Sequence, residues 1–168
     1  MGSPSPHDPA RTALMRRAVA LAEASVADGG GPFGALVVRD GRVLGEASNR
    51  VVADADPTAH AEVGALRAAG RLLGTHDLSG CEVYSSCEPC PMCLAALYWA
   101  RVERVWYAAT RADAAAAGFD DEHLYREVAL EPDRRELPVR PLAPDPEDAV
   151  DGTAPFRAWA AFDERTPY

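Results

Sequence analysis

The chain has 168 residues, a length that suits one globular domain and leaves little room for a second. The formal net charge is −9 and the arginines are scattered, which disfavours a nucleic-acid partner because phosphate binding normally needs a basic patch. The sequence shows no apolar run near the ~20 residues of a membrane span, and residues 1–9 lack the apolar core of a signal peptide. We therefore expect a cytoplasmic protein with no membrane partner.

The predicted elements, taken in chain order, alternate between helices and strands. After a disordered lead over 1–9, helical spacing predicts a helix over 10–27, and a hairpin follows with its turn at Asp40-Gly41. We expect strands at 33–38, 43–47, 81–85, 104–109 and 136–142, and further helices at 58–73, 91–101, 113–117, 121–130 and 155–162. This order indicates an α/β protein: a three-layer α/β/α sandwich with a mixed five-stranded sheet over 10–143, then a C-terminal helix and tail over 144–168.

Two short motifs hold the chemically distinctive residues: Thr58-Ala59-His60-Ala61-Glu62 and Cys87-Glu88-Pro89-Cys90-Pro91-Met92-Cys93. Together they offer an imidazole, up to three thiolates and a carboxylate, which is what a hydrolytic zinc site requires. An H-x-E segment with P-C-x-x-C is the signature of zinc-dependent base deaminases. An H-x-E alone is mostly solvated surface, and a C-x-x-C alone is compatible with a redox or buried pair. Their conjunction predicts one Zn²⁺ per subunit.

The zinc ligands follow from the spacing of the motifs. Cys90 and Cys93 are three residues apart at a helix start, where both sulfurs can face one metal and the helix dipole favours thiolates. A His-Cys₃ set that included Cys87 would make a closed structural site. Because Cys87 lies on the strand side of the turn, we expect His60, Cys90 and Cys93 as ligands and Cys87 as a buried thiol. Glu62 is then the catalytic base, passing a water proton to the substrate ring nitrogen and the leaving amine.

Beyond these motifs, the chain resembles the bacterial guanine deaminases of the cytidine-deaminase-like superfamily. The matching segments are 30–35, 56–63, 86–94, 98–101, 113–115, 117–121, 155–156 with Trp159, and the terminal Tyr168. The zinc motif specifies only the superfamily, whereas segment 118–121 and the terminal tyrosine indicate guanine. The resemblance implies the cytidine-deaminase-like fold and the hydrolysis of guanine to xanthine and ammonia.

The resemblance also implies the residues that bind the substrate. Asn49 would hydrogen-bond the purine, Phe33 would stack on its ring, and Ala61 and Ser86 would offer backbone groups near the attacking water. Taken alone, Phe33 is equally a core residue and Asn49 a turn residue. Trp99 is expected in the core or in a wall of the substrate pocket.

At the C-terminal end, the resemblance implies a domain-swapped homodimer in which Tyr168 closes the site of the neighbouring subunit. Asp121 and Tyr168 would contact the base edge and assist proton transfer as catalytic residues. Without the resemblance, Asp121 is a helix cap and Tyr168 a frayed terminus. The stretch 144–148 looks like an insertion before the last helix.

Other functions stay open at this point. The same reaction on guanosine, cytosine, cytidine or another aminated heterocycle is the nearest alternative. A tRNA adenosine deaminase is less compatible with the net charge of −9, because a tRNA-binding protein needs positive charge to bind phosphates. A non-catalytic zinc domain is a third alternative, although such a domain has no use for the carboxylate of Glu62.

Overall fold

The computed structural model describes residues 8–142 and 150–167, and the chain divides into two compact units after Leu124. The first unit contains the sheet and the helices that cover it. The second contains most of α6 (Glu122–Ala129), the 3₁₀ helix η1 (Pro132–Arg134) and α7 (Ala154–Ala161). Most of the expected disordered lead and the expected insertion at 144–148 lie outside the described residues.

The sheet of the first unit has four strands in the order β2-β1-β3-β4. They are β1 (Gly34–Arg39), β2 (Arg42–Ser48), β3 (Glu82–Cys87) and β4 (Arg104–Ala109). β1 pairs antiparallel with both β2 and β3, whereas β3 and β4 are parallel, so the predicted mixed sheet is confirmed. The predicted hairpin turn is also present, since Asp40 and Gly41 both adopt positive φ, at 51° and 74°.

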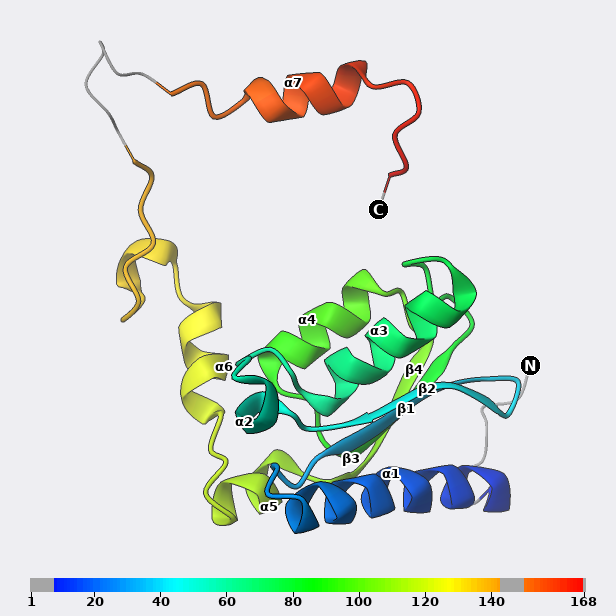
Figure 1. Cartoon of the computed structure of the whole chain (residues 1–168). Coiled ribbons are helices and arrows are strands. Elements are labelled where there is room, and N and C mark those ends of the chain that lie inside the picture. The colour runs from blue at the N-terminus through cyan, green and yellow to red at the C-terminus, as the bar shows by residue number, and fades with distance from the viewer. Residues whose placement is uncertain (1–7, 143–149, 168) are drawn as a thin grey trace. The chain divides into compact units, whose positions relative to one another are not determined.

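Helices cover both faces of this sheet (Figure 1). α1 (Pro9–Ala27) packs on one face, and α3 (Ala61–Leu73) and α4 (Pro91–Trp99) pack on the other. Alternate residues of β1 divide between the faces: Leu36 is buried with α1, whereas Ala35 and Val37 are buried with α3 and α4. The layers are therefore α/β/α. No helix in the described ranges is long and apolar enough to cross a membrane.

The expectation of a fifth strand over 136–142 is wrong. These residues form no strand in the structure, and their apolar side chains are exposed, with Leu142 86% accessible. Pro138 suggested that such a strand would lie at an edge of the sheet, but Pro138 and Pro141 each remove a backbone donor that a ladder needs. β4 is therefore an edge strand of the described sheet.

The helix expected over 58–73 begins three residues later, at Ala61. The Thr58 amide and hydroxyl both donate to Asp56 Oδ1, at 2.8 and 2.7 Å, so Asp56 caps a turn and not a helix. A short helix, α2 (Val51–Asp54), precedes this turn and was not expected. The consequence is that α3 starts at Ala61, which places His60 at its N-cap.

Candidate active site

His60 and Cys90 occupy equivalent positions at the starts of α3 and α4. Each is the N-cap residue with extended backbone, at φ −72° and ψ 154° for His60 and φ −66° and ψ 168° for Cys90. Neither side chain makes the hydrogen bond that a capping side chain would make to its own helix. Pro91 at the first position of α4 suits this start because it needs no backbone partner there. Both side chains are thus presented at neighbouring helix ends.

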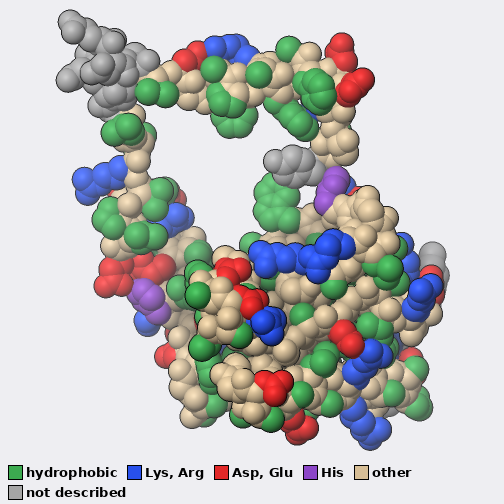
Figure 2. All heavy atoms as spheres, viewed as in Figure 1, with side chains coloured by type: hydrophobic (Ala, Val, Ile, Leu, Met, Phe, Trp, Pro, Cys, Tyr) green, Lys and Arg blue, Asp and Glu red, His purple; other side chains and the backbone are tan. Residues whose placement is uncertain are grey.

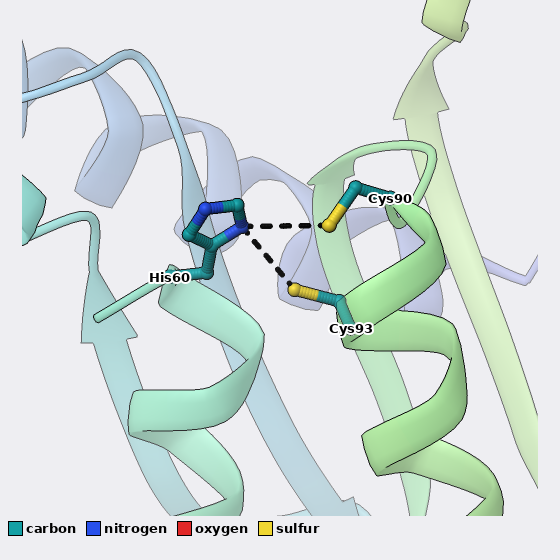
Figure 3. A group of neighbouring side chains, drawn as sticks. All are labelled: His60, Cys90 and Cys93. Atoms are coloured by element: carbon teal, nitrogen blue, oxygen red, sulfur yellow. Dashed lines mark hydrogen bonds between the residues drawn. The ribbon is translucent and has the colours of Figure 1, made fainter. Parts of the chain in front are cut away.

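The three predicted ligands come together at these helix ends (Figure 3). His60 Nδ1 lies 3.6 Å from Cys90 Sγ and 3.4 Å from Cys93 Sγ, and one donor atom from each residue lies within 4.8 Å of the others. Tetrahedral zinc, with Zn–N near 2.0 Å and Zn–S near 2.3 Å, would hold nitrogen and sulfur ligands about 3.6 Å apart. The spacing and chemistry of these donors fit zinc with a fourth position left for water or substrate.

The cysteine thiols differ in their readiness to bind metal. Hydrogen bonds with the Cys93 thiol and the His60 ring lower the pKa of Cys90 to about 4, whereas the bond to Cys90 and burial raise the pKa of Cys93. Burial raises the pKa of Cys87 to about 11, and its Sγ lies 3.6 Å from the Thr110 carbonyl oxygen. Geometry separates the ligands from the buried thiol: Cys90 and Cys93 cluster with His60, whereas the Cys87 thiol points to the Thr110 carbonyl.

Glu62 lies beside the three ligands in the first turn of α3. It is 5% exposed; its Oε2 lies 3.3 Å from Cys93 Sγ, and its Oε1 accepts a hydrogen bond from the Ser85 hydroxyl at 3.0 Å. Burial raises the pKa of this carboxyl group. A buried carboxyl group next to a metal site, with a pKa moved toward neutrality, is suited to proton transfer.

The cluster opens into a pocket of about 480 Å³. Phe33, Asn49 and Asp121, the residues expected to contact the base, all line it. Asn49 is 9% exposed, and its Oδ1 accepts a hydrogen bond from the Val51 amide at 3.2 Å. Burial raises the pKa of Asp121. The structure thus brings side chains from three distant segments to the same cavity as Glu62.

The remaining expected site residues have different surroundings. Ala61, which follows His60 in the chain, and Ser86 are both buried, and the Ser86 hydroxyl accepts a hydrogen bond from the Gly34 amide at 3.0 Å. Trp99 does not lie in the core, so that part of its expectation is wrong, and it is not among the residues that line the pocket. It is 68% exposed because it ends α4, about 12 Å along the helix from the metal-site end. Tyr168 lies outside the described residues.

Sequence reasoning missed several residues of the site. Phe119 and Asp120 line the pocket and belong to the segment 117–121 that carried the resemblance, so their positions could have been found there. Glu88 and Arg111 also line it, and the Arg111 amide donates to Glu88 Oε2 at 3.1 Å. The contact of Ser85 with Glu62 has no local sequence signal, because it depends on how α3 packs against β3.

A histidine and two cysteines with zinc-ligand spacing, next to a buried carboxyl group in a pocket, define the class of zinc-dependent hydrolytic deaminases. Residues 9–109 match the family model of the cytidine and deoxycytidylate deaminase zinc-binding region. The chain therefore belongs to the cytidine and deoxycytidylate deaminase family.

Within this family, similarity to guanine deaminases extends over nearly the whole chain. The guanine deaminase of Bacillus subtilis is 46% identical over 156 residues, which are 92% of this chain and 97% of the relative. Its X-ray structure superposes with a TM-score of 0.86 at 45% identity, covering 94% of this chain and 98% of that chain. A structure of the Nitrosomonas europaea guanine deaminase gives a TM-score of 0.64 at 38% identity, covering 68% and 66% of the two chains.

A tRNA-specific adenosine deaminase is similar over a shorter part of the chain. The enzyme of Aquifex aeolicus is 46% identical over 93 residues, or 54% of this chain and 62% of the relative. The Bacillus subtilis guanine deaminase thus matches 92% of this chain, whereas the Aquifex aeolicus enzyme matches 54%.

Proposed function

We propose that this chain is a guanine deaminase that hydrolyses guanine to xanthine and ammonia with one zinc ion per subunit. The observation that carries the proposal is the meeting of the ligand cluster and Glu62 with Phe33 and Asn49 at one pocket. The similarity to the Bacillus subtilis enzyme over 92% of the chain supports guanine as the substrate. None of the four cysteines forms a disulfide, which suits a cytoplasmic enzyme.

Proton transfer is the part of the reaction that Glu62 performs. When bound, zinc supplies a Lewis acid that makes water reactive at neutral pH. Glu62 accepts a proton from the attacking water and delivers it to the ring nitrogen N3 as the new C–O bond forms at C2. The remaining proton of the former water then moves to the exocyclic amine as the C2–N bond breaks and the C2=O bond of xanthine forms, and ammonia leaves. Asp121, whose pKa is raised by burial, lines the same pocket and is the second carboxyl group available to contact this edge of the base.

Asn49 and Phe33 orient the purine for this attack. Because Asn49 Oδ1 is occupied by the Val51 amide, Nδ2 is the group of this side chain that donates to an acceptor on the base. Phe33 packs edge to face against Phe119, which holds its ring in place for contact with the purine. When ionised, the carboxylate of Asp121 accepts from the N–H groups of the guanine edge.

Ammonia release from a substrate panel tests the proposal. The zinc-loaded protein is assayed with guanine, guanosine, cytidine, adenosine and a tRNA substrate, and we expect release from guanine at a rate well above the others. Faster release from another compound would show that guanine is not the substrate, while the assignment as a deaminase would still hold. Zinc binding without release from any of them would indicate a non-catalytic zinc domain.

The homodimer with a swapped C-terminal segment is part of the same proposal. The apolar side chains of α7 are exposed within this chain, among them Phe156 at 73%, and stand out along that helix in Figure 2. On α4, Tyr98 and Trp99 are exposed as well. Apolar surface of this kind is normally covered by a partner, and a second subunit would supply the cover.

A mixing experiment tests whether the tail is swapped. One chain lacks residues 166–168, which should leave zinc content intact and remove most activity, and the other carries Glu62→Gln with an intact tail. If tails are exchanged, the mixed dimer has one complete site, and an equimolar mixture recovers about a quarter of the wild-type rate. Mixed dimers without recovered activity would contradict swapping, and so would a fully active monomer in solution.

A further inference from the structure

Ser85 is a buried strand residue that contacts the proposed catalytic base. It lies on β3, an inner strand of the sheet, where it pairs with Ala35 of β1 and Tyr107 of β4. Its side chain is 2% exposed, and its hydroxyl donates to Glu62 Oε1 at 3.0 Å. The contact joins an inner strand of the sheet to the first turn of α3, so a strand paired on both sides holds Oε1 of Glu62.

This hydrogen bond makes the two carboxylate oxygens of Glu62 inequivalent. Oε1 is taken by Ser85, while Oε2 lies 3.3 Å from Cys93 Sγ, beside the ligand cluster. The terminal torsion of a glutamate side chain is broad and roughly two-fold, so the side chain's own preferences do not set the plane of the carboxylate. A donor on a paired strand restricts it, because the strand backbone is held by both neighbours and the serine oxygen is limited to a few staggered positions.

We propose that Ser85 is a positioning residue for deamination: its hydroxyl holds the Glu62 carboxylate in the plane that directs Oε2 to the attacking water and the substrate. This inference deepens the proposed function and rests on it. Outer partners of this kind change activity by about 10- to 100-fold when removed. We expect Ser85→Ala to lower kcat by about that factor, to leave KM for guanine within about threefold, and to retain zinc.

Tyr84 provides a matched control one position away on the same strand. Its hydroxyl also donates to a carboxylate, Glu82 Oε2, at 2.9 Å, but its side chain packs on the opposite face of the sheet with α1. Tyr84→Phe therefore removes a hydrogen bond of the same type without touching the pocket. We expect kcat and KM of Tyr84→Phe to stay at wild-type values, whatever its melting temperature.

The test compares Ser85→Ala, Ser85→Thr and Tyr84→Phe for kcat, KM, zinc content and melting temperature. Ser85→Thr keeps the hydroxyl, and threonine is well tolerated in strands, so we expect this variant to recover most of the kcat that Ser85→Ala loses. If Ser85→Ala does not fold, Ser85→Cys keeps the shape with a weak donor, and its kcat is expected to fall in the same way.

Several outcomes would overturn the role of Ser85. One is a kcat of Ser85→Ala within twofold of wild type. Another is a loss of zinc from Ser85→Ala that accounts for its lost activity. A third is a fall in kcat of Tyr84→Phe equal to that of Ser85→Ala. A folded, zinc-loaded Ser85→Thr no more active than Ser85→Ala would also overturn it. Failure of the proposed function itself looks different, because the wild-type protein would then release no ammonia from guanine.

Discussion

Phe33 and Phe119 meet edge to face at the pocket, with ring centroids 5.1 Å apart and ring planes at 87°. Phe33 immediately precedes β1, whereas Phe119 follows α5 (Arg111–Ala116), so the contact joins the sheet to a segment far along the chain. Asp121 lies two residues after Phe119 and lines the same pocket. This aromatic pair therefore couples Phe33, the residue proposed to stack on the purine, to the segment that carries Asp121.

Replacing Phe119 with alanine should weaken substrate binding more than turnover. An aromatic pair contributes about 0.5–1.5 kcal/mol beyond its buried area, so loss of the pair leaves the Phe33 ring less constrained. We expect KM for guanine to rise by about 10-fold and kcat to change less than threefold, measured by steady-state ammonia release. Leu72→Ala, at an exposed site of α3, serves as the control. An unchanged KM would show that the pair does not shape the binding site.

Glu62→Gln should abolish turnover while the protein keeps its zinc. Glutamine has nearly the same shape but cannot accept and release the proton, and general acid–base groups contribute about 10²- to 10⁴-fold to rate. We expect kcat to fall by at least about 100-fold, with metal content measured by atomic emission unchanged. The exposed Glu103→Gln provides the matched control. Activity comparable to wild type in Glu62→Gln would exclude Glu62 as the base.

The cysteine variants should separate ligands from the buried thiol. Cys90→Ala and Cys93→Ala each remove a donor of the cluster, so we expect both proteins to lose most of their zinc. Cys87→Ala removes a thiol that contacts the Thr110 carbonyl, and we expect one zinc ion per chain to remain. Metal content after dialysis gives the answer. Loss of zinc from Cys87→Ala would instead favour the closed His-Cys₃ site.

Gly45→Ala should destabilise the first unit. A Cβ at this position of β2 would overlap the Ala65 carbonyl and lie 2.6 Å from the Ala69 amide nitrogen, both in the backbone of α3. The helix must move away from the sheet, at a cost of about 1–3 kcal/mol in the free energy of unfolding. Urea titration measures this loss. Gly152→Ala, where a Cβ meets nothing within 4 Å, should leave the stability unchanged; equal effects would refute the packing argument.

The parts of the fold predicted best are those with strong local signals. Asp40-Gly41 specified the hairpin because few other residue pairs adopt two positive φ values, and Cys90-Pro91 marked the start of α4 correctly. The predictions were wrong where one local sequence pattern is compatible with two structures. Segment 136–142 carries apolar residues, as a strand does, but is interrupted by Pro138 and Pro141, and Asp56 caps a turn as readily as a helix.

The sequence by itself determined the available chemistry: an imidazole, thiols three residues apart and a nearby carboxyl group. Spacing within one helix start brings Cys90 and Cys93 together, because such neighbours share a helix face. Only the tertiary structure decided that His60 reaches both sulfurs, that Cys87 turns to Thr110, and that Ser85 holds Glu62. These contacts depend on the register of β3 and the packing of α3 and α4 on one sheet face, which no local spacing encodes.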